Sequence, residues 1–329
     1  MSTRFALACG ALAAVILAAP AGDQWPDPAA APKMAGAGPS AAPHPAAART
    51  TGQAPAESDC NPQNRRASLR PQGPLPAPGT MPAGSTMARI AQRGHLIAGI
   101  NQGLHKLPSR DDNLRLEGFD IDIIRDIAEA IFGNREQVVF RAMTTADVIP
   151  TARSGNVDLV VATTTITCTR REQVDFSTVY YEAGQRVLVN RGSAITGLGD
   201  LGGKRVCATR GSTSLANILA ATPKPIPVGE ATETDCLVLL QLGEVDAIST
   251  DDTLLASLAA QDPRTEIVGP QFTEEPYGVV INKDTPDLVR FVNTVLDSRA
   301  QDGRWRASYQ RWLAPLGTPP PPPTPRYRD

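Results

Sequence analysis

Residues 154–177 read SGNVDLVVATTTITCTRREQVDFS, and this stretch indicates both a fold and a site. The Gly near its start is a common helix stop, and the largely apolar residues 157–161 predict a buried strand. That strand ends in the hydroxyl side chains of residues 163–165, and Arg170 follows on the next turn. Ligands bind at the carboxyl ends of strands in open α/β sheets, and a guanidinium binds a carboxylate with two hydrogen bonds. The stretch therefore predicts an α/β protein with a carboxylate site at this strand end.

Residues 242–251, LGEVDAISTD, repeat the pattern of residues 154–163. In both, a helix ends near a Gly, Val-Asp follows, and a buried strand ends in polar side chains. We interpret them as similar units in two lobes, one carrying Arg170 and the other Asp251. A cation that faces an anion across a cleft fits a zwitterion, with the carboxylate on Arg170 and the ammonium on Asp251.

The order of predicted elements alternates between strand and helix, which is typical of a parallel α/β fold. The first lobe is expected to comprise residues 86–189 and 277–316, and the second residues 190–276. Residues 186–190 and 277–281 are the strands expected to cross between the lobes. Two crossings form a hinge that can open and close.

The ends of the chain differ from this body. Most of the 30 prolines fall in residues 20–82 and 315–325. We expect a largely disordered Pro/Ala-rich linker at 22–85 and a Pro-rich tail at 317–329. Residues 1–21 fit a signal peptide, with an uncleaved anchor as the alternative, and Cys9 lies early for a lipid attachment site. The formal net charge of −2 gives no reason to expect nucleic-acid binding.

Four cysteines follow Cys9, and an even number in an exported chain favours disulfides over reduced thiols. Four cysteines allow three pairings. We favour Cys207–Cys236, because both residues fall in the second lobe, and Cys60–Cys168, which would tie the linker to the first lobe. The spacings do not match a zinc site.

Several short motifs together resemble one protein family. They are Gly118–Asp122, residues 163–178, Gly203–Cys207, Gly211–Ser214, Ser249–Asp252, Glu275–Gly278 and the tail 322–327. The chain resembles the family-3 extracytoplasmic solute-binding proteins of ABC transporters over residues 86–316. Within them it is similar to the glutamate/aspartate/asparagine-binding lipoproteins of mycobacteria.

The resemblance implies a two-lobe, type II periplasmic-binding-protein fold. It implies a monomer without a cofactor, secreted or anchored to the outer face of the cell membrane. The expected partners are a free amino acid and the membrane permease of an ABC transporter.

The resemblance also implies roles for individual residues. Arg170 and Thr165 would bind the ligand on the first lobe, and Thr213 and Asp251 would reach it from the second. Thr163 could donate its hydroxyl to the ligand as well, and Asn101 and His105 would line the first-lobe wall. A structural interpretation competes for several of these. Arg170 could pair with Glu172 or Asp175 on the surface, Asp251 could cap the next helix, and Thr213 could belong to an ordinary helix start.

The chain departs from the family at two positions. Binders of acidic amino acids often carry arginines where Asn101 stands and near Val148. The ligands that remain open are glutamate, aspartate, asparagine and glutamine.

Two other functions are possible on the same scaffold. A sensor subunit would use the same cleft to signal to a membrane receptor. An enzyme would need an acid or base at the reacting bond, and of the three histidines only His105 is expected near the cleft. We therefore expect a binding protein rather than an enzyme.

Overall fold

The computed structural model describes residues 60–61 and 64–328, which belong to one compact unit. The expected signal peptide 1–21, Cys9 and the linker up to residue 59 lie outside the described residues.

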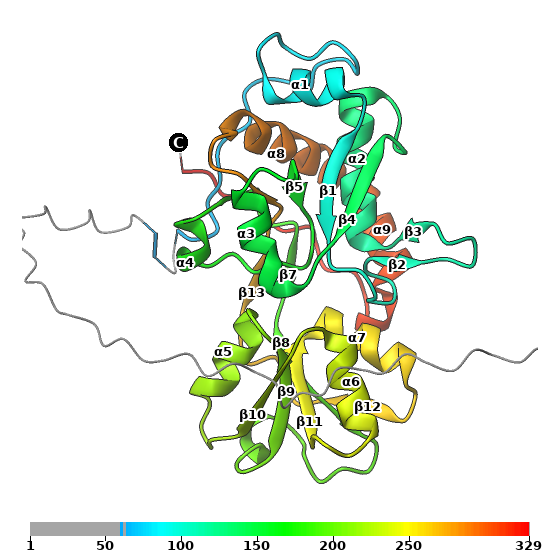
Figure 1. Cartoon of the computed structure of the whole chain (residues 1–329), viewed down its shortest axis with the longest axis vertical. Helices are drawn as coiled ribbons and strands as arrows, with labels where there is room; N and C mark the ends of the chain where they lie inside the picture. The colour runs from blue at the N-terminus through cyan, green and yellow to red at the C-terminus, as the bar shows by residue number, and fades with distance from the viewer. Residues whose placement is uncertain (1–59, 62–63, 329) are drawn as a thin grey trace, which may run out of the picture. The chain divides into compact units, whose positions relative to one another are not determined.

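The first lobe is built on a five-stranded sheet in the order β4-β1-β5-β14-β6 (Figure 1). Its strands are β1 (Leu96–Ile100), β4 (Val138–Ala142), β5 (Leu159–Val160), β6 (Asp175–Phe176) and β14 (Val280–Ile281), beside the small hairpin β2 (Ser109–Arg110) and β3 (Leu116–Glu117). Its helices are α1 (Thr86–Arg93), α2 (Phe119–Phe132), η1 (Thr145–Asp147), α3 (Val148–Arg153), α4 (Cys168–Arg171), α8 (Pro286–Gln301), α9 (Arg304–Trp312) and η3 (Ala314–Leu316).

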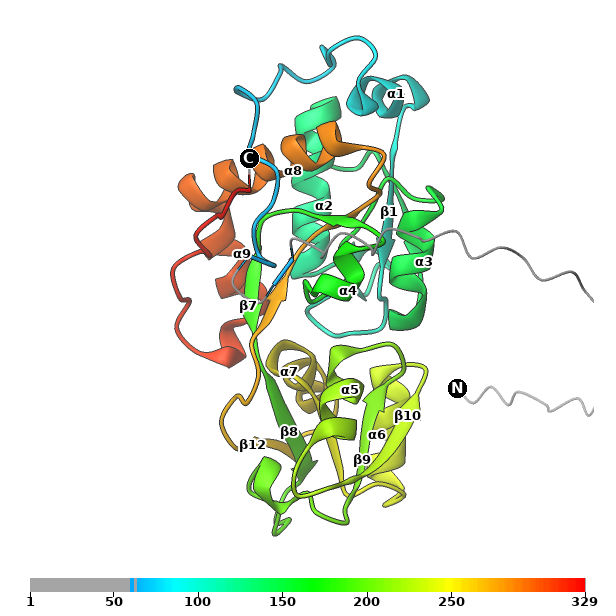
Figure 2. The ribbon, with the colours of Figure 1, turned by 90° about the vertical axis from the view of Figure 1, so that its left-hand side faces the viewer.

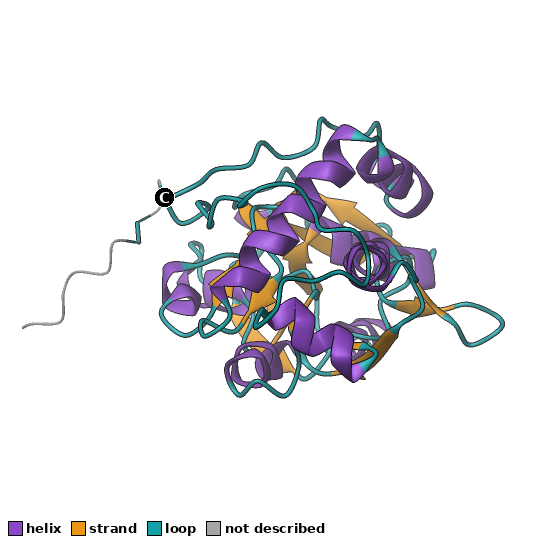
Figure 3. Ribbon diagram, turned by 90° about the horizontal axis from the view of Figure 1, so that it is seen from above, coloured by secondary structure: helices purple, strands orange, loops and turns teal. Residues whose placement is uncertain are grey.

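The second lobe is built on a sheet in the order β10-β9-β11-β8-β12. Its strands are β8 (Gln185–Asn190), β9 (Arg205–Thr209), β10 (Ile226–Glu230), β11 (Ala247–Asp251) and β12 (Thr265–Val268). Its helices are η2 (Leu198–Asp200), α5 (Thr213–Ala220), α6 (Glu233–Gln241) and α7 (Asp252–Gln261). Seen from above, helices lie on both sides of the strands (Figure 3).

Both sheets are mixed rather than purely parallel. In the first, β1 runs parallel to β4 and β5, whereas β14 is antiparallel to β5 and β6. In the second, β9 runs parallel to β10 and β11, whereas β8 is antiparallel to β11 and β12. The prediction of α/β structure is correct. The purely parallel arrangement is wrong, because a strand that enters its sheet from the other lobe runs against its neighbours.

The hinge consists of β7 (Tyr181–Ala183) and β13 (Glu275–Tyr277), an antiparallel pair with Pro276 opposite Glu182 (Figure 2). This corrects the expected crossings. Residues 185–190 are β8 of the second sheet, and residues 280–281 are β14 of the first. The chain stays extended from one sheet into the next, so no helix or long loop marks the point at which it changes sheets.

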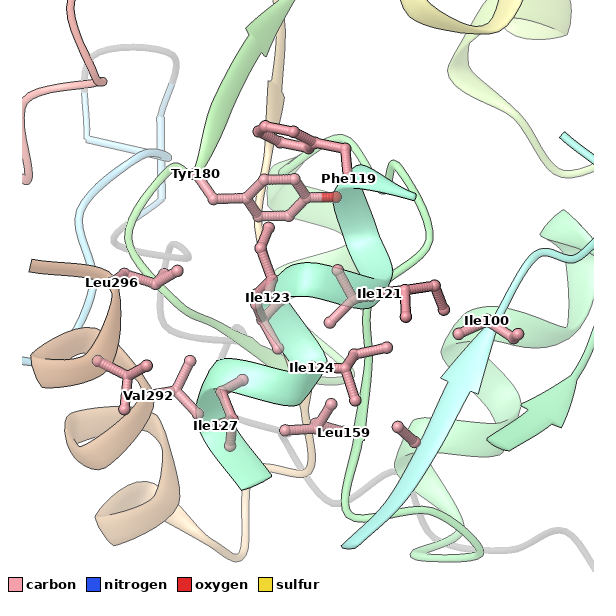
Figure 4. Close-up of a cluster of buried hydrophobic side chains, with 14 of the residues drawn as sticks. Ile100, Phe119, Ile121, Ile123, Ile124, Ile127, Leu159, Tyr180, Val292 and Leu296 are labelled. Carbon is pink, nitrogen blue, oxygen red and sulfur yellow. The ribbon is translucent and has the colours of Figure 1, made fainter. Parts of the chain in front are cut away.

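The core of the first lobe is centred on α2, whose isoleucines contact two surfaces. Figure 4 shows Ile121, Ile124 and Ile127 between strand residues such as Leu159 on one side and Val292 of α8 on the other. Burial of each such side chain contributes about 1.5–3 kcal/mol. This packing fixes the strands whose ends carry the site.

Residues 64–85 correct the expectation of a disordered linker over that part of the chain. Ser68 is fully buried, and its hydroxyl donates to the carbonyl oxygen of Phe176 at 2.7 Å. Asn293 of α8 donates to the Ser68 hydroxyl and to the Leu69 carbonyl oxygen. These residues need no core of their own, because the first lobe supplies apolar surface and hydrogen-bond partners.

The tail returns to the same place. Ser68 and Tyr327 form a parallel bridge, in which the Ser68 N–H donates to the Arg326 carbonyl oxygen at 2.9 Å. The Tyr327 hydroxyl donates to Asp297 at 2.6 Å. Residues 64–70 therefore lie between the body of the first lobe and the tail.

Candidate ligand-binding cleft

The buried carboxylate of Asp120 holds the turn that follows β5. Thr163 has a φ of +46°, which is uncommon for a β-branched residue. Its N–H donates to Asp120 of α2 at 3.2 Å, and the Tyr180 hydroxyl donates to the other carboxylate oxygen at 3.2 Å. Burial raises the pKa of Asp120 to about 7, although both hydrogen bonds lower it. Asp120 thus positions the turn that carries the threonines.

Arg170 lies on α4, which begins after the capping residue Thr167. Its guanidinium donates to the Thr165 carbonyl oxygen at 2.7 Å and to the Gly211 carbonyl oxygen, in the second lobe, at 3.1 Å. Burial lowers its pKa, and the nearby carboxylates of Glu275 and Asp251 raise it. Arg170 therefore points into the space between the lobes, and its hydrogen bonds are to these carbonyls rather than to Glu172.

Gly211 lies close to the first lobe. Its φ is +79°, and a Cβ added there would lie 2.9 Å from the Cα of Ala146. A side chain at this position would collide with backbone of the opposite lobe. Glycine is thus required for the two lobes to approach this closely.

Asp251 ends β11 and is 3 % exposed. It accepts a hydrogen bond from the Tyr277 hydroxyl of the hinge strand β13 at 2.6 Å and a longer one from Ser214 at 3.4 Å. Burial, and then the charge of Glu275, raises the pKa of Asp251 well above its usual range. Asp251 occupies the N-cap position of α7 but makes no capping hydrogen bond, because its carboxylate turns toward the cleft and the hinge.

Thr213 contacts Thr165 of the opposite lobe and Glu275 of the hinge strand β13. The sequence interpretation did not include Glu275. Its hydroxyl donates to Glu275 at 2.8 Å and lies 3.4 Å from the hydroxyl of Thr165. Glu275 is 3 % exposed and also accepts from Asn217 at 3.2 Å. The motif Glu275–Gly278 was noticed as a family signature, and its acidic residue next to an expected crossing strand was the signal that could have drawn attention to it.

These side chains surround one small cavity of about 30 Å³. The lining residues are Thr145, Val148, Ile149, Ala162, Thr163, Thr164, Thr165, Arg170, Ser212, Thr213, Ser214 and Asp251. A volume of this size accommodates about one or two waters. In this conformation the lobes are closed against each other, and entry of a larger molecule requires them to separate about β7 and β13.

Two of the predicted wall residues, Asn101 and His105, are not part of the cavity lining. Asn101 is buried and sits beside the cavity, where its amide donates to Thr145 at 3.4 Å and to Glu233 of the second lobe at 3.3 Å. His105 is exposed and does not line the cavity, so its predicted place in the wall is wrong. The chain turns away after β1 through Lys106, which has a φ of +67°.

Both favoured disulfides are present in the structure. Cys60 is bonded to Cys168, two residues before Arg170, and Cys207 of β9 is bonded to Cys236 of α6. The first connects the N-terminal segment to the helix that carries the cleft arginine. The second joins the central sheet of the second lobe to a covering helix.

The model of the bacterial extracellular solute-binding proteins, family 3, matches residues 96–315, a range that includes both sheets, the hinge and the cleft. The chain belongs to this family. In the described part of the chain, no helix is both long and apolar enough to cross a membrane.

Individual family members are similar over most of their length. The ABC transporter glutamine-binding protein of Bacillus subtilis is 35% identical over 69% of this chain and 84% of its own. A solved ancestral arginine-binding protein bound to glutamine is 34% identical, with a TM-score of 0.62 over 67% of this chain and 98% of that one. The solute receptor for L-cysteine of Neisseria gonorrhoeae is 27% identical, with a TM-score of 0.67 over 70% and 95%. The fold is that of the type II periplasmic binding proteins, as the sequence predicted.

Proposed function

We propose that this family-3 protein binds a free L-amino acid between its lobes and delivers it to the permease of an ABC transporter. The observation that carries the proposal is that Arg170 of the first lobe and Asp251 of the second line the same cavity. A guanidinium and a carboxylate on opposite walls match the two charges that every free amino acid carries at neutral pH.

The proposed binding sequence uses the hydrogen bonds now made by the protein itself. The ligand carboxylate docks on Arg170 and Thr165, replacing part of the contact between Arg170 and the Gly211 carbonyl oxygen. Closure then brings Thr213 to the carboxylate and Asp251 to the ammonium. Exclusion of water lowers the local dielectric constant and strengthens both charge pairs. Thr163 contributes through its backbone position in the turn.

The relatives support an amino acid as the ligand, because the proteins named above are described as binding glutamine, arginine or L-cysteine. Their description as binding proteins also supports a binding rather than a catalytic role. The ligands expected from the sequence were glutamate, aspartate, asparagine and glutamine. The pair of charges on Arg170 and Asp251 serves the head group common to all of them.

We further propose a monomer that acts outside the cytoplasm after export by the segment 1–21. Membership of an extracellular family supports this location. The likeness of the tail 322–327 to the mycobacterial lipoproteins suggests attachment to the outer face of the membrane. A sensor subunit that signals to a membrane receptor would use the same cleft.

The test is direct titration of the folded chain with free amino acids. A thermal-shift screen of the twenty amino acids should identify ligands, since a ligand at one hundred times its Kd stabilises the protein by about 2.7 kcal/mol. Arg170→Ala should then weaken the best ligand by roughly 3–5 kcal/mol in calorimetry, because the variant leaves a buried carboxylate unpaired.

The matched control is Arg141→Ala, which removes an exposed arginine of β4 outside the cavity lining. This variant should bind as the wild type does. Near-native binding by Arg170→Ala, or no thermal shift with any amino acid, would contradict the proposal.

A further inference from the structure

We propose that Glu233, together with Asn101, selects the ligand by its side chain, accepting side chains that end in N–H donors and excluding those that end in a carboxylate. This inference rests on the proposed function and narrows its ligand. The donors belong to a carboxamide, as in glutamine, or to a cation, as in arginine. Neither the motif analysis nor the head-group site involves Glu233.

Glu233 places a buried carboxylate behind one side of the cavity lining, next to Asn101 and Thr145. It is the first residue of α6 and is 3 % exposed. It accepts hydrogen bonds from Asn101, across the gap between the lobes, and from Thr209 of its own lobe, both at 3.3 Å. The Asn101 amide also reaches Thr145, which lines the cavity. Glu233 is therefore separated from the cavity by a single layer of side chains.

The contact between Asn101 and Glu233 has to break when the lobes separate. Glu233 then loses one donor and faces the open cleft. A ligand side chain that extends from the head-group site along the Thr145 wall can replace the lost donor as the lobes close again. An N–H group restores the hydrogen bond, whereas a carboxylate oxygen has no proton to donate.

The charges around the cleft favour the same choice. Among the described residues no ion pair joins Glu233 to an arginine or lysine, and its partners Asn101 and Thr209 are neutral. Burial raises the pKa of Glu233 because those neutral donors only partly offset the loss of hydration. Asp251 lines the cavity, and Glu275 and Glu233 are buried behind its lining, whereas Arg170 is the only arginine or lysine among the described residues that line it. A second carboxylate on the ligand would add like charge to a site of low dielectric constant.

Selection by Glu233 narrows the set of ligands that was expected from the sequence. Glutamate and aspartate fit the head-group site but not the side wall. Glutamine and asparagine fit both, and so do cationic amino acids, which the sequence interpretation did not include. The absence of arginines at positions 101 and 148, noted as a departure from acidic binders, agrees with this selection.

A competing role for Glu233 is purely mechanical. Its hydrogen bond to Asn101 links the two closed lobes, so Glu233 could stabilise closure for every ligand equally. The two roles predict different results. If Glu233 selects the ligand, its substitution changes the ratio of affinities between ligands. If Glu233 is only a latch, that is, a contact that holds the lobes closed, its substitution changes all affinities by the same factor.

The experiment is calorimetry on the full chain with L-glutamine, L-glutamate and L-arginine. Glutamine and glutamate have nearly the same shape, so their ratio isolates the side-chain charge. We expect glutamine or arginine to bind at least about 100-fold more tightly than glutamate in the wild type. Glu233→Gln should reduce that ratio at least about 10-fold, and Glu244→Gln, an exposed residue after α6, should leave it unchanged.

The arginine titration separates the two kinds of donor. If the wall binds a cation, Glu233→Gln weakens arginine more than glutamine, because only arginine loses a charge pair. If it binds a carboxamide, the wild type prefers glutamine, and Glu233→Gln mainly improves glutamate. Asn101→Asp is a second variant on the opposite lobe. It adds negative charge to the same wall and should widen the preference for glutamine over glutamate.

Two results would overturn the inference while leaving the proposed function intact. One is a wild type that binds glutamate as tightly as glutamine and arginine. The other is an equal change for all three ligands in Glu233→Gln, which would assign Glu233 to the latch alone. Failure of every amino acid to bind would instead contradict the proposed function itself.

Discussion

Asp120 illustrates how a single side chain outside the cleft determines its geometry. The carboxylate receives the N–H of Thr163, so the hydroxyl-bearing turn depends on a residue of α2 that is distant in sequence. Its environment favours the neutral acid over the charged form. The stability of the fold should therefore depend on pH through this group.

The pH dependence has a definite sign. The pKa of Asp120 rises from 3.8 to about 7 on folding, so between these values the folded chain holds a proton that the unfolded chain has released. Stability from this group is highest below pH 4 and is lost as pH rises toward 7. The loss is at most about 4 kcal/mol at 1.36 kcal/mol per unit.

Asp120→Asn should therefore flatten the decline in the free energy of unfolding between pH 5 and pH 8, measured by chemical denaturation. An amide can still accept from Thr163 and does not ionise. Asp112→Asn, an exposed residue in the loop between β2 and β3, should retain the wild-type slope. Equal slopes in both variants would mean that Asp120 does not titrate in this range.

At the scale of elements, the N-terminal segment 64–70 contacts both the first lobe and the hinge. Arg171 of α4 donates to the carbonyl oxygens of Arg65 and Ala67. Arg66 forms ion pairs with Glu182 of β7 at 2.7 Å and with Glu274, just before β13, at 2.9 Å. The segment thus contacts both strands that carry the motion of the lobes.

The Cys60–Cys168 disulfide attaches this segment to α4. Removing the disulfide tests how much the attachment contributes to stability. The pair closes a loop with a sequence separation of 108, against 29 for Cys207–Cys236. The chain-entropy model assigns the longer loop about 4–5 kcal/mol and the shorter about 3–4 kcal/mol.

We expect the double variant Cys60→Ser with Cys168→Ser to lose stability of that order, and slightly more than Cys207→Ser with Cys236→Ser, in urea denaturation. A loss below about 1 kcal/mol would mean that residues 64–70 are held by their other contacts alone.

At the scale of the whole described unit, the closed arrangement depends on contacts between the lobes rather than within them. Thr165 lies against Thr213, Arg170 against the Gly211 carbonyl oxygen, and Asn101 against Glu233. These three contacts are polar, and each can be exchanged for one to a ligand, whereas Leu254 of α7 adds an apolar contact to the core of the first lobe. Opening and closing about the two hinge strands is therefore the motion that the architecture favours.

A covalent lock between the lobes tests this motion. The hydroxyl oxygens of Thr165 and Thr213, on opposite lobes, are 3.4 Å apart, so these two positions are the choice for an engineered disulfide. Oxidised Thr165→Cys with Thr213→Cys should fail to take up ligand, because the cavity of about 30 Å³ cannot admit an amino acid while closed.

Reductant at a level that leaves wild-type binding unchanged should restore uptake in the double variant, and the single variant Thr165→Cys should show no redox dependence. Unimpeded uptake by the oxidised, cross-linked protein would show that ligand enters without separation of the lobes.

Local sequence determined the parts of this protein that depend on neighbours along the chain. The strand that leads to residues 163–165 and the repeat around Asp251 could both be predicted from periodicity and helix stops. The expected export of the chain and the assignment of each cysteine to a lobe together favoured the two disulfide pairings that the structure contains.

Only the tertiary structure decided what meets across the sheets and the lobes. Contacts between distant segments determine the hinge boundaries, the docking of residues 64–85 and the exposed position of His105. Composition and periodicity carry no information about such contacts. The same holds for Asp120 behind Thr163, for Glu275 beside Thr213 and for Glu233 opposite Asn101. A buried carboxylate reveals its role only through its partners, because burial and hydrogen bonding set its charge and its pKa, and both are properties of the folded chain.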